Sequence, residues 1–168
     1  KPYLYWFTII ASTTVGTTLA DFVTRSLGIG YSGGSSLLLG LVIFSLLGWY
    51  KVEGSVSPHT VNKPKSEVFY WLTITFSQTL GTALGDWSAD TIGLGYSGGI
   101  ALFSALILLM VFLYKFTSVS RTFLFWSTFI LTRPLGAVVG DFLDKPLSAG
   151  GLDLSRFAAS GVILVAIL

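Results

Sequence analysis

The stretch Leu80-Gly-Thr-Ala-Leu-Gly-Asp86 decides the fold, because the rest of the chain is built from copies of it. Each copy places small residues and then an acid inside a long apolar run; the others are Val15-Gly-Thr-Thr-Leu-Ala-Asp21 and Leu135-Gly-Ala-Val-Val-Gly-Asp141. In every copy the Asp follows a Trp by fifteen residues, from Trp6, Trp71 and Trp126 respectively. A spacing that recurs in this way indicates an internal duplication.

The composition is that of a membrane protein. Of the 168 residues, 52% are hydrophobic and 11% are charged, whereas a soluble domain carries about 25% charged residues. The 13 Phe, 7 Tyr and 5 Trp suit aromatic belts at the membrane interfaces. A net charge of +2 without a basic run argues against nucleic acid as a partner. The lack of Cys excludes disulfides, thiolate metal sites and Cys nucleophiles.

Six apolar runs follow one another along the chain: 5–24, 32–50, 69–89, 97–116, 122–143 and 155–168. The first five have the length of a spanning helix, which needs about 20 residues. The runs form three pairs, so we expect an all-α, polytopic transmembrane helical bundle. It is a single membrane domain over residues 1–168, built from helical-hairpin repeats at 5–50, 69–116 and 122–168. Because each repeat has two spans, all copies share one orientation and are parallel repeats.

The basic residues predict which side of the membrane each loop faces. Of the 10 Lys and Arg residues, the connections between repeats hold Lys51, Lys63, Lys65, Lys115 and Arg121. The turns within repeats hold Arg25, Lys145 and Arg156. Since cytoplasmic loops carry the excess of Lys and Arg, we expect the connections between repeats, including the loop 51–67, to be cytoplasmic.

The small residues of the repeated stretch predict close helix packing. Glycines spaced by four let helix backbones approach where lipid offers no hydrophobic driving force. The glycines in question are Gly16, Gly81, Gly85, Gly136 and Gly140.

The acids Asp21, Asp86 and Asp141 recur at one equivalent depth. An acid in a spanning helix is costly and usually faces the bundle interior or a water-filled cavity. Carboxylates beside hydroxyls such as that of Thr82 are hard oxygen ligands, suited to divalent cations or protons. The alternative is local pairing, because Asp21 and Asp141 each have a basic residue four positions later. Asp86 has Asp90 there instead, so Asp86 and Asp90 are the acids that structure explains least.

Arg133 is the deepest cation and is followed by Pro134, which permits a kink. Two interpretations stay open: a structural ion pair that holds repeats together, and a fixed charge that sets substrate or ion selectivity. Three further polar residues are expected either to line the same region or to pack between helices: Thr17, Thr18 and Gln78.

Two turns match the dinucleotide fingerprint G-x-G-x-x-G, at residues 28–33 and 93–98. That fingerprint needs a preceding strand, and here it joins two apolar helices, so we reject nucleotide binding. The sequence has no P-loop and no HExxH motif, and its one His lies in the loop 51–67. We therefore expect no enzyme activity and no cofactor.

Several strings resemble a family of bacterial integral membrane proteins of unknown function. They are Glu67-Val-Phe-Tyr-Trp71, Leu80-Gly-Thr-Ala-Leu-Gly-Asp86 and Ile130-Leu-Thr-Arg-Pro-Leu-Gly-Ala-Val-Val-Gly-Asp141. That family has tandem repeats of two transmembrane segments with a characteristic Trp, usually in four copies. The resemblance implies a bacterial inner membrane protein, and one more hairpin upstream of Lys1. It implies an architecture and no activity.

Two functions are compatible with these features. The first is a transporter or exporter of a small cation, either a divalent metal or a proton-coupled ion, that uses the intramembrane Asp residues. The second is a non-transporting membrane subunit or assembly partner of a larger complex. The expected partners are the lipid bilayer, a small cation or proton, and further copies or other subunits in the membrane.

Overall fold

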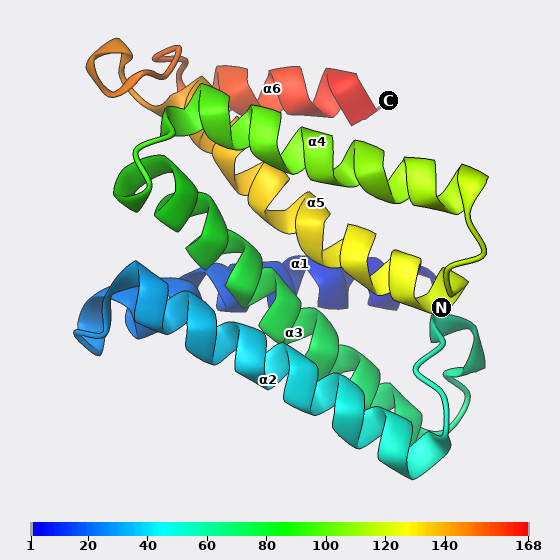
Figure 1. Cartoon of the computed structure of the whole chain (residues 1–168). Helices are drawn as coiled ribbons and strands as arrows, with labels where there is room; N and C mark the ends of the chain where they lie inside the picture. Colours follow the sequence, from blue (N-terminus) through cyan, green and yellow to red (C-terminus); the bar gives the residue numbers. More distant parts are fainter. Residues whose placement is uncertain (1, 168) are drawn as a thin grey trace.

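The six apolar runs of the sequence become six α-helices joined by short turns (Figure 1). The computed structural model describes residues 2–167, without the side chains of Pro2, Asp90, Ala166 and Ile167. Within that part the all-α prediction is confirmed, and no strand is present. The helices are α1 (Pro2–Asp21), α2 (Gly30–Glu53), α3 (Pro64–Asp86), α4 (Gly95–Phe116), α5 (Arg121–Asp144) and α6 (Arg156–Ile167).

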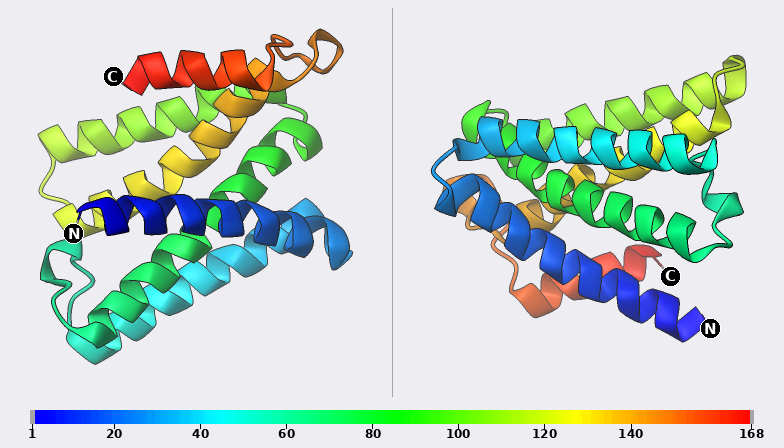
Figure 2. Two further views of the ribbon diagram at one scale, coloured as in Figure 1. Left: turned by 180° about the vertical axis from the view of Figure 1, so that it is seen from behind. Right: turned by 90° about the horizontal axis from the view of Figure 1, so that it is seen from below.

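The central helix is α3, since α1, α2 and α5 all pack against it. Seen from below, the helices form three layers: α2 with α4, then α3 with α5, then α1 with α6 (Figure 2, right). The first repeat therefore places its two helices in opposite outer layers. The second and third repeats each place their first helix in the central layer and their second helix in an outer layer. The first helices of the first and third repeats, α1 and α5, both pack against α3, the first helix of the second repeat.

Three helices are long and apolar enough to cross a membrane: α2, α4 and α5. The chain is therefore a membrane protein by the length and hydropathy of these helices. With 20 and 23 residues, α1 and α3 have the predicted length but fall outside this group. Both are rich in Ser, Thr and Gly, which lowers their hydropathy.

Glycines turn the chain between the two helices of the first two repeats. Gly28 and Gly30 have φ of 69° and 67°, and their counterparts Gly93 and Gly95 have 76° and 64°. Left-handed backbone of this kind favours glycine because it has no Cβ. The dinucleotide-like pattern is thus explained by two tight turns between helices.

An aromatic cluster ties α2, α3 and α5 together near the loop between the first two repeats. The ring of Trp49 lies 6.0 Å from that of Trp126 and 6.3 Å from that of Tyr70, both edge-on. The indole nitrogen of Trp126 donates a hydrogen bond of 2.8 Å to the Val56 carbonyl. The repeat Trp therefore has a different environment in each copy: Trp126 is 4% exposed, whereas Trp6 is 62% exposed.

Glycines set the distance between α1, α3 and α5. A Cβ built at Gly16 would lie 3.3 Å from the Gln78 Cβ, so α1 approaches α3 closely there. A Cβ at Gly81 would overlap the Cβ of Arg133, and one at Gly85 would lie 2.9 Å from the Ala137 Cβ. At these three glycines the helices therefore approach too closely for a larger side chain.

The glycines of the third copy differ from those of the first two. No atom of the described residues lies within 4 Å of a Cβ built at Gly136 or Gly140. The reason is geometric: α5 meets α3 through Arg133 and Ala137, so its glycines face away from that contact. Gly136 faces a cavity instead.

Candidate functional site

A cavity of about 490 Å³ lies between α1, α3 and α5. Its lining is polar and charged, and every lining residue comes from these helices or from the residues just after them. The residues are Thr13, Thr17, Asp21, Arg25, Gln78, Thr82, Asp86, Thr132, Arg133, Gly136, Ala137, Asp141 and Lys145. The structure thus brings Asp21, Asp86, Asp141, Arg133 and Thr82 together in one place.

Most of the residues that line the cavity occupy equivalent positions in the three repeats. The lining contains the residues found 7, 11 and 15 positions after the Trp of each repeat, and the residues found 19 positions after it in the first and third repeats. A spacing of four keeps side chains on one face of a helix, so each repeat presents the same face to the cavity. The first three layers are Thr13, Gln78 and Arg133; then Thr17, Thr82 and Ala137; then Asp21, Asp86 and Asp141.

The fourth layer holds Arg25 from the first repeat and Lys145 from the third. Its member from the second repeat is Asp90, whose side chain lies outside the described residues. Thr18 does not line the cavity, because it faces a shallow groove on another side of α1 with Thr14 and Ile10.

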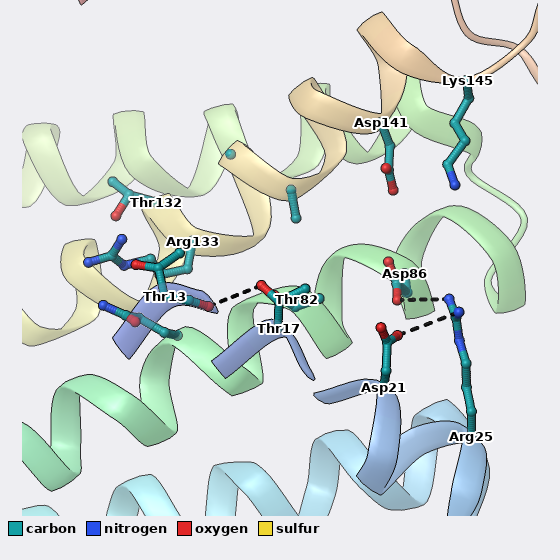
Figure 3. Close-up of a pocket in the computed structure, with 13 residues that line it drawn as sticks. Thr13, Thr17, Asp21, Arg25, Thr82, Asp86, Thr132, Arg133, Asp141 and Lys145 are labelled. Atoms are coloured by element: carbon teal, nitrogen blue, oxygen red, sulfur yellow. Dashed lines mark hydrogen bonds and ion pairs between the residues drawn. The ribbon is translucent and has the colours of Figure 1, made fainter. Parts of the chain in front are cut away.

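Arg25 joins the acids of two repeats. Its guanidinium lies 3.5 Å from the Asp21 carboxylate and 3.6 Å from that of Asp86 (Figure 3). The Asp86 side chain is 14% exposed and that of Asp21 is 47% exposed. The local pair of Asp21 expected from the sequence is therefore present, and the same cation also serves Asp86 of the next repeat. The Nε of Arg25 also donates a hydrogen bond of 3.2 Å to the Tyr31 hydroxyl.

Asp141 and Lys145 extend from α5 toward the same group of charges (Figure 3). The cavity thus gathers three carboxylates with two cationic side chains at the end where α1 and α3 finish. No group of three or more His, Cys, Asp or Glu arranged to hold a metal ion is present among the residues described.

A change of helical winding follows the acid in the first two copies. After Asp21 and Asp86 the chain continues into one π-helical turn, Phe22–Ser26 and Trp87–Thr91 respectively. Each turn is closed by a backbone hydrogen bond that spans five residues, of 3.1 Å from Leu27 and 3.0 Å from Ile92. Turns of this type are frequent at functional sites, since they re-aim the side chains beside them. In the third copy α5 runs on to Asp144 as an α-helix.

The opposite end of the cavity holds Arg133 and Gln78. Gln78 is 4% exposed, and neither of its amide atoms makes a hydrogen bond with any described residue. The buried Nε of Arg133 likewise has no hydrogen-bond partner there. The Arg133 guanidinium lies over the Phe129 ring, 4.6 Å from its centroid. None of the ion pairs between described residues includes Arg133, so the structural ion pair expected as one alternative is not seen.

Sequence reasoning did not single out Thr13, Thr132 or Ala137 as lining residues. The signal that would have found Thr13 and Ala137 was present in the spacing. Both follow the repeat Trp at the same four-residue step as the acids, by 7 and 11 positions. Thr132 carries no such signal, because it lies one position before Arg133 on α5.

The fold and the site define a class: an all-α membrane protein of helical-hairpin repeats with one charged cavity between the first helices of its repeats. Within that class the chain belongs to the family described as Repeat of Unknown Function (DUF347), which matches residues 4–55, 69–120 and 124–168. These three matches confirm the tandem repetition inferred from the sequence. No curated protein and no solved structure matches the chain.

Proposed function

We propose that this protein is a transporter of a small cation, with Asp21, Asp86 and Asp141 as the groups that receive the cation or a coupling proton. The observation that carries the proposal is that these three acids, one from each repeat, line a single cavity. Intramembrane acids that share a polar cavity mark ion pathways and proton relays in membrane proteins.

The ion pairs of the cavity support a mechanism of exchange. Arg25 lies within 3.6 Å of two carboxylates from different repeats, so a cation that arrives at Asp86 competes directly with Arg25. The pair distances of 3.5 and 3.6 Å are long for charge-assisted hydrogen bonds, which fall near 2.8 Å. Such loose pairs give way to a cation or proton at a modest cost.

We also propose that the protein lies in a bacterial inner membrane with its connections between repeats on the cytoplasmic side. The support is the excess of Lys and Arg in those connections. In this arrangement α1 and α3 cross the membrane with α2, α4 and α5, and their polar faces turn toward the cavity. At 1.5 Å per residue, the fifteen residues from Trp to Asp span about 22 Å, which puts the acids in the outer leaflet.

Asp86→Asn is expected to lower cation-driven proton movement at least tenfold. Asn keeps the size of the side chain but neither attracts a cation nor takes up a proton. The protein is reconstituted into liposomes that enclose a pH-sensitive dye, and Na⁺, K⁺, Mg²⁺, Mn²⁺ or an alkylamine is added outside. The wild-type protein should respond to at least one of these cations.

The matched control is Asp144→Asn. Asp144 lies on α5 outside the cavity and pairs with Arg156 at 3.9 Å, so its loss should leave the flux unchanged. Equal flux in the Asp86→Asn variant and the wild type would contradict the role of Asp86. No cation-dependent flux in the wild type would contradict transport and favour the assembly-subunit interpretation. Elution of both variants at the wild-type position in size-exclusion chromatography shows that they are folded.

A further inference from the structure

The two ends of the cavity differ in charge. Among the described side chains, the acid end carries three carboxylates against the cations Arg25 and Lys145, which leaves one excess negative charge. The other end carries the single cation Arg133 with the neutral side chains of Gln78, Thr13 and Thr132. A small solute inside the cavity therefore meets a negative end and a positive end.

The positive end has hydrogen-bonding groups that the protein leaves unused. The amide of Gln78 and the Nε of Arg133 are buried without a hydrogen-bond partner among the described residues. A buried polar group without a partner costs about 1–3 kcal/mol, so such groups in a native protein need an explanation. Both residues line the cavity, where a ligand supplies the missing partner.

The geometry of these donors suits an anionic group. The cation–π contact with Phe129 lies on the ring face and leaves the N–H groups of the Arg133 guanidinium available to donate hydrogen bonds. A guanidinium presents its donors as a planar fork that matches a carboxylate. The Gln78 amide adds two N–H donors from the equivalent position of the neighbouring repeat.

We infer that the substrate of this cavity is a small zwitterion, whose carboxylate binds Arg133 and Gln78 and whose ammonium group faces Asp21, Asp86 and Asp141. This inference rests on the proposed function and names the substrate class of the same cavity. A simple cation makes no use of the donors of Arg133 and Gln78, whereas a zwitterion engages both ends of the cavity at once.

The separation between the two ends of the cavity favours zwitterions whose two charges are far apart. Arg133 and Asp141 are eight residues apart on α5, which is about 12 Å of helix rise. A ligand that contacts both residues therefore needs an extended spacer between its two charges. An α-amino acid, with its charges on adjacent carbons, reaches only one end.

The experiment compares three matched probe series by calorimetric titration of the protein in lipid nanodiscs. The series are ω-amino acids from glycine to 6-aminohexanoate, alkylamines of the same chain lengths and alkanoates of the same chain lengths. In the wild type, at least one longer ω-amino acid should bind tenfold or more tighter than its matched amine and its matched alkanoate.

Two variants test the positive end. Arg133→Gln should remove the advantage of the ω-amino acid and leave the affinity for the amine unchanged; it keeps the Cβ that packs against Gly81. Gln78→Glu, which is nearly isosteric, should weaken ω-amino acid binding at least tenfold by repelling the carboxylate. Arg121→Gln is the control, because Arg121 lies on the same helix outside the cavity. Retained amine binding reports that each variant is folded.

The outcomes separate this inference from the proposed function. If cation flux depends on Asp86 but no ω-amino acid binds more tightly than its matched amine, the inference is overturned and cation transport stands. An unchanged advantage in both Arg133→Gln and Gln78→Glu also overturns it. If cation flux is absent as well, both proposals fail together.

Discussion

Replacing Gly81 by alanine should destabilise the protein by about 3 kcal/mol, the upper part of the range for overpacked contacts. The new Cβ would overlap the Cβ of Arg133 and would lie 3.1 Å from both its Cα and its carbonyl carbon. These atoms are fixed to the backbone, so no change of rotamer relieves the overlap. Helices α3 and α5 must separate, and this contact forms one wall of the cavity.

Gly136→Ala is the matched control from the same position of the third repeat. Nothing among the described residues lies within 4 Å of its added Cβ. Alanine should therefore stabilise α5 by roughly 1 kcal/mol through its higher helix propensity. Unfolding in mixed micelles with increasing denaturing detergent measures both variants. Equal stability of the Gly81→Ala variant and the wild type would show that α3 and α5 are not in close contact.

Trp126→Ala is the second change with a large expected effect, about 3 kcal/mol. It removes a ring that is 4% exposed and packs against Trp49 and Tyr70, and it leaves the Val56 carbonyl without its donor. Truncating a buried Trp costs about 3–5 kcal/mol in soluble proteins. The lower end applies here, because apolar surface gains less from burial when lipid is the alternative solvent.

The repeat supplies the control for this prediction as well. Trp6 occupies the equivalent position in the first copy and is 62% exposed, so Trp6→Ala should cost less than about 1 kcal/mol. The same detergent unfolding curves compare the two. A loss of equal size in both variants would mean that the aromatic cluster around Trp126 does not hold the repeats together.

Most of the architecture could be predicted from the sequence, because hydropathy and repeat spacing report it directly. The six runs and the Trp-to-Asp interval predict six helices and three repeats, and both are found. The glycines of α1 and α3 predict close contacts, which form at Gly16 and Gly81. Gly136 makes no such contact. The motif determines that the helix has a small surface there, but it does not determine which helix packs against that surface.

The site was only partly predictable. The common spacing of the acids indicates a shared depth, but whether they share a cavity depends on how α1 and α5 cross α3, which spacing does not encode. Arg25 illustrates the limit: its place four residues after Asp21 predicts a local pair, while its second contact, with Asp86, arises only from tertiary packing. The unused hydrogen-bonding groups of Gln78 were equally invisible, since burial without a partner is a property of the folded protein.

A shared transport site requires that equivalent positions of the three repeats face one water-filled cavity. These 168 residues contain no Cys, so the introduced thiols are the only ones within them. Thr17→Cys, Thr82→Cys and Ala137→Cys place thiols on α1, α3 and α5 in the same layer. Val15→Cys is the control, because Val15 is 57% exposed on α1 and does not line the cavity.

Double-cysteine variants are treated in membranes with a short, water-soluble bis-thiol reagent, and cross-linking is read by mass spectrometry after proteolysis. We predict cross-links in all three pairings of Thr17→Cys, Thr82→Cys and Ala137→Cys, and none between Val15→Cys and Ala137→Cys. Absence of cross-links in the three cavity pairings, with the single thiols unreactive to a water-soluble label, would contradict the shared cavity.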